Sequence, residues 1–237
     1  MTRIADRLNA VRARIERACT LAGRDAGTVA LLAVSKTFDA DAVREAAAAG
    51  QRAFGENYVQ EALAKQAMLR DLRLEWHFIG PIQSNKTRDI AAHFDWAHGI
   101  DRLKIAQRLS DQRPYDLPPL DVCVQVNVSG EASKSGCTPD AAPALCRAVA
   151  ALPRLRLRGL MAIPAPITPG TDARAPFRLL RVLFESLKAE GLALDTISAG
   201  MSEDLEAAIM EGSTMVRIGT AIFGSRTRAS DDVDSRA

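Results

Sequence analysis

Lys36 is the residue of this chain whose position suggests chemistry most directly. It follows the apolar run at 29–34, and so short a run bounded by polar residues predicts a strand buried on both faces, as in a parallel sheet. A lysine is costly inside such a strand, because an ammonium buried without a partner loses its hydration. At the carboxyl end of the strand, partial desolvation instead lowers the pKa of an amine, which can then form a Schiff base with a carbonyl. The alternative is a solvated surface charge, so other residues must decide.

Two loops further along the chain contain groups that suit a phosphate. The first runs from Ser198 to Ser202, where Ser202 is a candidate N-cap for a helix that begins near residue 203. A helix start offers unpaired N–H groups and the positive end of the helix dipole. In the second loop, Gly219 lets the backbone approach an anion and Thr220 adds a hydroxyl. Each loop alone could be an ordinary cap or turn, but together they favour a phosphate site.

A lysine amine and a phosphate site at one place together indicate pyridoxal 5′-phosphate (PLP), an aldehyde that carries a phosphate. Arg217 then acquires a role, because a guanidinium stays protonated in proteins. Facing the pyridine nitrogen, it would donate a hydrogen bond and keep that nitrogen unprotonated. The ring would then be a weaker electron sink, and a protein can tune this cofactor in that way. The alternative for Arg217 is a salt bridge at the rim of the fold.

The elements that must position these residues alternate regularly along the chain. Eight segments have the pattern of strands: 29–34, 52–55, 75–79, 96–99, 121–127, 157–163, 194–198 and 214–218. Seven helical patterns lie between them, at about 39–49, 57–70, 85–93, 101–112, 138–151, 173–190 and 203–211. Such alternation predicts right-handed βαβ units and a parallel sheet. Eight units in 237 residues favour a closed (β/α)8 TIM barrel, for which roughly 250 residues are typical, over an open doubly wound sheet.

A barrel would also explain why the candidate residues converge. Loops at the carboxyl ends of its strands form the site, and phosphate often binds after strands seven and eight, where Ser202 and Gly219 lie. Nothing helical is expected after strand eight, so an amphipathic N-terminal helix would fill the eighth outer position. Its apolar face consists of Ile4, Leu8, Val11, Ile15 and Ala18. We expect residues 1–224 to form a single domain and residues 225–237 to be a disordered polar tail.

Composition excludes several classes of function. Hydrophobic residues make up 47% of the chain and charged residues 25%, as in a globular protein with a large core. A net charge of +2 without a basic block speaks against nucleic acid and anionic membranes, and no apolar stretch approaches the roughly 18 residues of a membrane span. The four cysteines have no metal-like spacing with the three histidines, so we expect free thiols and no metal. The arginine-rich N-terminus could be a transit peptide, but Asp6 and Glu16 argue for a cytoplasmic protein.

Six motifs follow one another across nearly the whole chain. They are LAVSK at 32–36, FGENYVQE at 54–61, WHFIGPIQSNK at 76–86, VNVSGE at 126–131, GLMAIP at 159–164, and the stretch from GMS at 200–202 to Gly224. In this order they resemble one family, the single-domain pyridoxal phosphate homeostasis proteins. Ala199, where a methionine is usual, and the segment 97–101 depart from the family's pattern. Neither departure touches the candidate residues, so both concern local packing.

The resemblance implies a fold, a cofactor and a set of contacts. The family is similar to the barrel domain of the alanine racemases, the fold-type III PLP enzymes. By motif match, Lys36 would carry PLP as an internal aldimine. The other implied contacts are Asn57 beside the cofactor ring, Arg217 at the pyridine nitrogen, and Ser202, Gly219 and Thr220 at the phosphate. The family is tied to vitamin B6 and amino-acid balance and is regarded as having no established turnover.

The likeness to racemases raises the question of catalysis. Two-base racemisation needs an acid/base group on each face of the substrate carbon, and in alanine racemases a second, β-rich domain supplies one of them. This chain has no residues left for such a domain. Of its two tyrosines, Tyr58 lies at a helix start, where we expect core packing, and Tyr115 lies in a loop flanked by prolines. We expect His77, on the third strand, to be a satisfied core histidine.

We therefore expect a monomeric PLP carrier or buffer of intracellular vitamin B6 homeostasis, and not an enzyme. Its recipients would be apo-PLP enzymes, and Lys134, in a polar loop after strand five, would guide PLP in or out. One alternative is a weak, racemase-like PLP enzyme that acts on amino acids. The other is a barrel that binds a different phosphorylated metabolite, with Lys36 only a phosphate contact.

Overall fold

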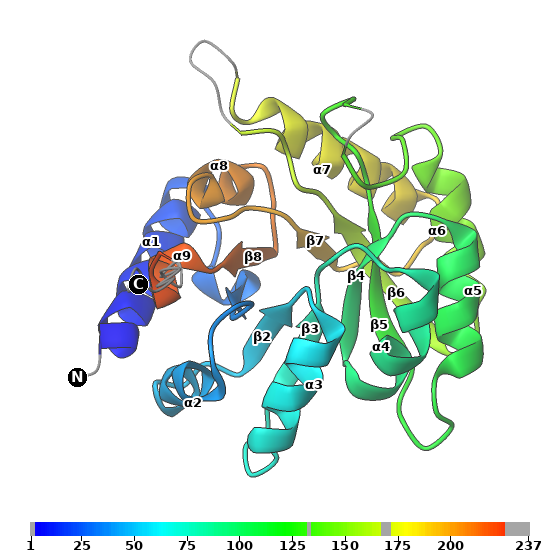
Figure 1. Ribbon diagram of the computed structural model, residues 1–237. Coiled ribbons are helices and arrows are strands. Elements are labelled where there is room, and N and C mark those ends of the chain that lie inside the picture. The colour runs from blue at the N-terminus through cyan, green and yellow to red at the C-terminus, as the bar shows by residue number, and fades with distance from the viewer. Residues whose placement is uncertain (1–2, 132–133, 167–171, 226–237) are drawn as a thin grey trace, which may run out of the picture.

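The computed structural model describes residues 3–131, 134–166 and 172–225 (Figure 1). Eight parallel strands pair in chain order, and β1 also pairs with β8, which closes the sheet into a barrel. The strands are β1 (Ala30–Val34), β2 (Ala53–Glu56), β3 (Glu75–Phe78), β4 (Trp96–Ile100), β5 (Leu120–Gln125), β6 (Leu155–Met161), β7 (Thr196–Ser198) and β8 (Met215–Ile218). The predicted (β/α)8 TIM barrel is confirmed, and the open sheet is excluded because the β1–β8 pair leaves no edge.

Helices surround the barrel as the alternation predicts (Figure 1). They are α1 (Arg3–Leu21), α2 (Ala40–Ala48), α3 (Val59–Met68), α4 (Thr87–His93), α5 (Leu103–Gln112), α6 (Ala142–Ala150), α7 (Ala175–Ala189), α8 (Leu205–Met210) and α9 (Thr220–Phe223). Two 3₁₀ turns, at Ala26–Thr28 and Ser84–Lys86, complete the described elements. None of the helices in the described part of the chain is long and apolar enough to cross a membrane.

The N-terminal helix α1 fills the outer position that the sequence assigns to it. It packs against α8, α9 and α2, and its predicted face supplies the buried Leu8, Val11 and Ile15. The expectation that nothing helical follows strand eight is wrong. After Gly219 the chain forms the short helix α9, and Phe223 at its end stacks on Phe38 with 5.1 Å between ring centroids.

The barrel interior is unusually polar at its centre. His77, His98 and Ser198 are completely buried there, and Arg217 is 4% exposed. The expectation of a disordered tail concerns residues 225–237, of which 226–237 lie outside the described residues. The loop after β6 is described only as far as residue 166 and again from residue 172.

Candidate functional site

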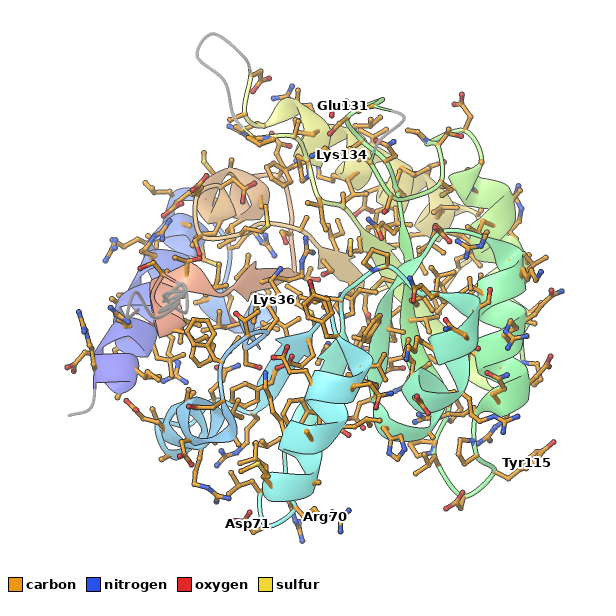
Figure 2. All side chains as sticks on the ribbon, in the orientation of Figure 1. Lys36, Arg70, Asp71, Tyr115, Glu131 and Lys134 are labelled. Atoms are coloured by element: carbon orange, nitrogen blue, oxygen red, sulfur yellow. The ribbon has the colours of Figure 1, made fainter. Side chains whose placement is uncertain are left out.

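The candidate residues come together in one cavity at the carboxyl ends of the strands. The cavity has a volume of about 570 Å³, and loops from both halves of the chain line it. All six residues proposed from the sequence are among its lining residues: Lys36, Asn57, Ser202, Arg217, Gly219 and Thr220. Lys134 lines it as well, from the loop after β5, and Figure 2 shows Lys134 above Lys36 in this view.

Lys36 owes its place to the alternation of side chains along β1 and the turn that follows. Ser35, one position earlier, is fully buried on the other side of the wall, where its Oγ donates to Glu56 Oε1 at 2.6 Å. Lys36 therefore points to the cavity. The next residue, Thr37, has a φ of 70°, a left-handed conformation that costs a residue with a Cβ about 1 kcal/mol or more. Something must hold this turn.

A buried ionic cluster under α3 holds the turn on both sides of Lys36. Lys65 Nζ donates to Glu56 Oε1 at 2.8 Å, to Glu61 Oε1 at 2.6 Å and to the Ser35 carbonyl at 2.8 Å. The same Glu61 oxygen accepts the Thr37 N–H at 2.6 Å. We call Ser35, Glu56, Glu61 and Lys65 the Lys65 cluster. It fixes the backbone of both neighbours of Lys36, and sequence reasoning missed it although Glu61 and Lys65 have the i,i+4 spacing of a helical ion pair.

The Lys65 cluster contains a carboxylate, Glu56, whose burial is costly. Burial raises the pKa of Glu56 above its ordinary value, and Lys65 only partly offsets this effect. Glu56 Oε2 is buried without a hydrogen-bond partner among the described residues. The carboxylate therefore depends on its single cation, because an unpaired buried charge is strongly destabilising.

Asn57, directly after β2, lines the cavity and has one unsatisfied polar atom. Its Oδ1 is buried and has no hydrogen-bond partner in the described part of the chain. Gly80 packs against it so closely that a Cβ on Gly80 would lie 2.9 Å from Asn57 Cβ. A buried acceptor left without a donor costs free energy, so Asn57 is suited to accept a hydrogen bond from a ligand.

Ser202 lies in the expected loop but does not cap the helix as predicted. The helix α8 begins at Leu205 with Asp204 at its N-cap, and Asp204 Oδ1 accepts the Met201 N–H at 2.5 Å. This side-chain contact ties Asp204 to the loop and delays the helix, so Ser202 stays in the loop at the cavity wall. Arg14 of α1 donates to the Ser202 carbonyl at 3.0 Å, a support that no local sequence signal indicates.

Gly219 and Thr220 line the cavity where β8 passes into α9. A Cβ on Gly219 would lie 3.2 Å from the Val34 carbonyl oxygen, tighter than an ordinary contact. Gly219 therefore allows the end of β8 to lie against the end of β1, close to Lys36. Thr220 begins α9, and the first N–H groups of a helix have no partner within the helix.

Arg217, on β8, lines the cavity, and hydrogen bonds to Ser198 and Ala162 fix its guanidinium. Its Nη1 donates to the Ser198 carbonyl at 2.5 Å and to Ser198 Oγ at 2.8 Å, and its Nη2 donates to the Ala162 carbonyl at 2.8 Å. Burial lowers the pKa of Arg217 to about 10, an effect that Asp204 opposes. The guanidinium is still a cation at neutral pH.

The histidine and tyrosine expectations have opposite outcomes. His77 is a satisfied core histidine as expected: its Nδ1 lies 2.9 Å from His98 Nε2 and its Nε2 lies 2.6 Å from Glu75 Oε1. The expectation of core packing for Tyr58 is wrong, because its side chain at the start of α3 is 58% exposed. Tyr115 is 93% exposed and lies at the edge of the molecule, far from Lys36 (Figure 2). Neither tyrosine is among the lining residues of the cavity.

The donor set of the cavity fits an aldehyde phosphate better than a metal. It is lined by two lysines, Lys36 and Lys134, by Arg217, by the acidic residues Glu203 and Asp204, and by Asn57, whose Oδ1 has no partner among the described residues. Among the residues that the structure describes, no cluster of histidine, cysteine and carboxylate groups could hold a metal ion. All four cysteines are free thiols, as expected.

Known proteins similar to this chain also point to pyridoxal phosphate. The family model of the alanine racemase N-terminal domain matches residues 7–227. A pyridoxal phosphate homeostasis protein of Pseudomonas aeruginosa is 66% identical over 226 residues, which are 95% of this chain and 97% of that protein. The protein of the same name from Escherichia coli K12 is 56% identical over 229 residues, with 95% and 98% of the two chains covered.

Solved structures agree with these sequence relatives. PipY of Synechococcus elongatus, whose structure contains bound PLP, is 40% identical, with a TM-score of 0.80 over 93% of this chain and 100% of its own. Alanine racemase of Streptomyces coelicolor shares the fold alone, at 19% identity and a TM-score of 0.70, over 94% of this chain and 59% of that enzyme. With its barrel, its cavity and these relatives, the chain belongs to the pyridoxal phosphate homeostasis protein family.

Proposed function

We propose that this protein binds PLP covalently through Lys36 and takes part in intracellular PLP homeostasis as a carrier or buffer. One observation supports the proposal above all. Lys36, the unsatisfied Asn57 Oδ1 and the cationic Arg217 line the same cavity as the two loops suited to a phosphate. PLP, when bound, supplies an aldehyde that condenses with amines and a ring that withdraws electrons.

Each residue of the cavity has a role in this proposal. The Lys36 amine is the point of attachment, and the Lys65 cluster keeps its flanking backbone in place. Ser202, Gly219 and Thr220 hold the phosphate at the ends of β7 and β8. Asn57 accepts a hydrogen bond beside the ring, and Arg217 donates to the ring nitrogen.

Storage suits these residues better than turnover. An arginine at the ring nitrogen keeps that nitrogen unprotonated, which weakens the ring as an electron sink. Both tyrosines are exposed and absent from the lining of the cavity, so neither supplies a general acid or base there. The name of the relatives, homeostasis protein, is consistent with a role other than catalysis.

Several finer points belong to the same proposal. Residues 1–224 would form one PLP-binding domain, and the protein would act as a monomer that delivers PLP to apo-PLP enzymes. Four free thiols and the absence of a membrane-spanning helix in the described residues support a cytoplasmic location, because reducing compartments keep thiols unpaired.

The test is an absorbance titration of the purified protein with PLP, followed by reduction with borohydride. The wild-type protein should develop the absorbance of an imine, and reduction should remove it. Lys36→Ala should show neither change, whereas Lys104→Ala, an exposed lysine on α5, should behave as the wild type. An unchanged spectrum in the wild type would instead favour a barrel that binds another phosphorylated metabolite.

A weak PLP enzyme that acts on amino acids is the second candidate, favoured by the fold shared with alanine racemases. A panel of amino acids tested for racemisation and transamination separates it from a carrier. The carrier proposal predicts no substrate-dependent turnover above that of free PLP. Turnover that Lys36→Ala abolishes would establish the enzyme instead.

A further inference from the structure

A chain of hydrogen-bonded side chains runs through the barrel interior from the cavity to the opposite end of the barrel. It begins at Arg217, which donates to Ser198 Oγ at 2.8 Å. Ser198 Oγ lies 2.9 Å from His98 Nδ1, and His98 Nε2 lies 2.9 Å from His77 Nδ1. His77 Nε2 lies 2.6 Å from Glu75 Oε1. We call these five residues, which come from β8, β7, β4 and β3, the interior relay.

The two ends of the relay differ in their exposure. The middle members Ser198, His98 and His77 have no exposed surface, and Arg217 is almost fully buried. Glu75 is the first residue of β3, at the amino end of the strands, and half of its side chain is exposed. The relay therefore connects the wall of the cavity to solvent at the far end of the barrel.

The chemistry of the end groups fixes their roles. A guanidinium can only donate, so Ser198 Oγ accepts from Arg217 and has its own hydrogen to give. At the other end, the hydrogen bond from His77 lowers the pKa of Glu75, so its carboxylate is ionised and can only accept. His77 Nε2 therefore carries a hydrogen and donates it to Glu75.

The middle of the relay follows from one property of His98. Complete burial, together with the nearby Arg217, lowers the pKa of His98 well below its ordinary value, so its ring is neutral and carries one hydrogen. If the hydrogen on Nε2 is the only ring N–H of His77, its Nδ1 must accept from His98 Nε2–H. His98 Nδ1 then accepts the hydroxyl hydrogen of Ser198. Every hydrogen bond thus points from Arg217 toward Glu75.

The opposite order is possible only with a second hydrogen on His77. His98 would then carry its hydrogen on Nδ1, and Ser198 Oγ would accept from both neighbours. Glu75, Asp95 and Arg158 are the charged groups around this end of the relay. Trp96 covers the face of the His77 ring, with 5.2 Å between centroids. The two orders differ in the tautomer of His98, which is measurable.

We propose that Ser198, His98 and His77 are positioning residues for Arg217. Their directed hydrogen bonds link its guanidinium to Glu75 and hold it in one orientation toward the cavity. The proposal rests on the proposed function, in which Arg217 faces the ring nitrogen of PLP. It adds that the orientation of the Arg217 guanidinium depends on residues that do not touch the cofactor. Because Glu75 ends the relay, a change at the far end of the barrel should reach the cavity.

The first test uses the PLP-free protein and the nitrogen NMR signals of its histidine rings. The chain has three histidines, and the exposed His93 on α4 is an internal control. At about pH 8 we expect the rings of His77 and His98 each to carry a single N–H, on Nε2. A His98 ring with its hydrogen on Nδ1, or a mixture of tautomers, would overturn the directed relay.

Matched variants distinguish a relay from simple core packing. Glu75→Ala removes the final acceptor and should release the His98 ring into a mixture of tautomers, whereas Glu75→Gln, whose amide oxygen can still accept, should keep the wild-type pattern. Ser198→Ala should also release His98 and should speed solvent exchange of the Arg217 N–H groups. Ser110→Ala, the same change at a buried serine of α5 outside the relay, should do neither. Unchanged His98 signals in Glu75→Ala would contradict the proposal.

The second test adds PLP labelled with ¹⁵N in its ring. Ser198→Ala and Glu75→Ala should shift the ring-nitrogen signal and release PLP faster, by roughly tenfold for Ser198→Ala, which removes a hydrogen bond to a charged group. Glu75→Gln and Ser110→Ala should match the wild type. An unshifted signal in Ser198→Ala would overturn the positioning role. If the wild type bound no PLP, the proposed function would fail, and the histidine and arginine signals of the PLP-free protein would still decide the relay.

Discussion

Two polar networks support the cavity from opposite sides, and they differ in how they use charge. The Lys65 cluster lies outside the barrel wall, beneath α3, and holds the backbone around Lys36 with a cation between two carboxylates. The interior relay lies within the barrel and reaches Arg217 through a serine and two histidines. In the Lys65 cluster, charged side chains fix the strained turn at Thr37. In the interior relay, a serine and two histidines orient Arg217 without placing another charged group directly beside it.

The largest expected effect comes from removing the cation of the Lys65 cluster. Lys65→Met leaves the buried Glu56 without its cation, with only the Ser35 hydroxyl as a partner, and such a broken buried pair costs about 3–5 kcal/mol. Urea unfolding should show this loss of stability. Lys104→Met on the exposed face of α5 should stay within about 0.5 kcal/mol of the wild type. A loss of less than about 1 kcal/mol for Lys65→Met would mean that the cluster is not held by charge.

A break in the interior relay should cost less, because no ion loses its only partner. His98→Phe leaves His77 Nδ1 without its partner, whereas Ser198 Oγ keeps Arg217, and one unsatisfied buried group costs about 1–3 kcal/mol. The same unfolding measurement applies, with His93→Phe at an exposed position as the control. An effect as large as that of Lys65→Met would remove the distinction between the two networks.

The two networks should also respond to pH in opposite directions. Burial raises the pKa of Glu56 above 4.5, so the folded state holds that proton more tightly, and the contribution of Glu56 to stability is lost as pH rises above this value. The hydrogen bond from His77 lowers the pKa of Glu75 below 4.5, so its contribution is lost as pH falls. Unfolding free energies of Glu56→Gln and Glu75→Gln, each compared with the wild type from about pH 3 to about pH 7, measure both.

Relative to the wild type, Glu56→Gln should gain stability as pH rises through its window. Glu75→Gln should be less stable than the wild type near neutral pH, and this difference in unfolding free energy should shrink as the pH falls. If both variants changed in the same direction with pH, one of the two assignments would be wrong.

The smallest effect concerns the rim of the cavity, outside both networks. Lys134→Ala should leave the PLP content unchanged and slow the transfer of PLP to an apo-enzyme, because the lysine lines the cavity near Lys36 and its amine can exchange with the bound aldehyde. Recovery of the recipient's activity over time measures the transfer, and Lys104→Ala is the matched control. Transfer at the wild-type rate would show that Lys134 is only a solvated loop residue.

Periodicity was sufficient to predict the barrel. All eight strands and the face of α1 follow from short apolar runs and helical spacing, because these patterns report which side of an element is buried. Two features were not predicted from periodicity, a short helix and a helix start that depends on one contact. The four-residue helix α9 has too few residues for a period, and Asp204, by accepting the Met201 N–H, moves the start of α8 past Ser202.

The cavity residues were predictable for a different reason than their supports. Lys36, Arg217 and Gly219 lie at strand ends, where the fold itself predicts a site. Arg14 and His98 act through partners distant in sequence, and His98 and Ser198 are 100 positions apart. Two local signals were present: the i,i+4 spacing of Glu61 and Lys65, and a histidine within a buried strand, whose partners only the closed barrel identifies.

The central claim is that Lys36 carries PLP in this cavity, and mapping the site of attachment tests it most directly. The PLP-loaded protein is reduced with borohydride and digested, and the modified peptide is identified by mass spectrometry. We predict the modification on Lys36 alone, with Lys65 unmodified because its Nζ donates three hydrogen bonds within the buried cluster. Modification of Lys134 in place of Lys36, or an even spread over surface lysines, would contradict the account.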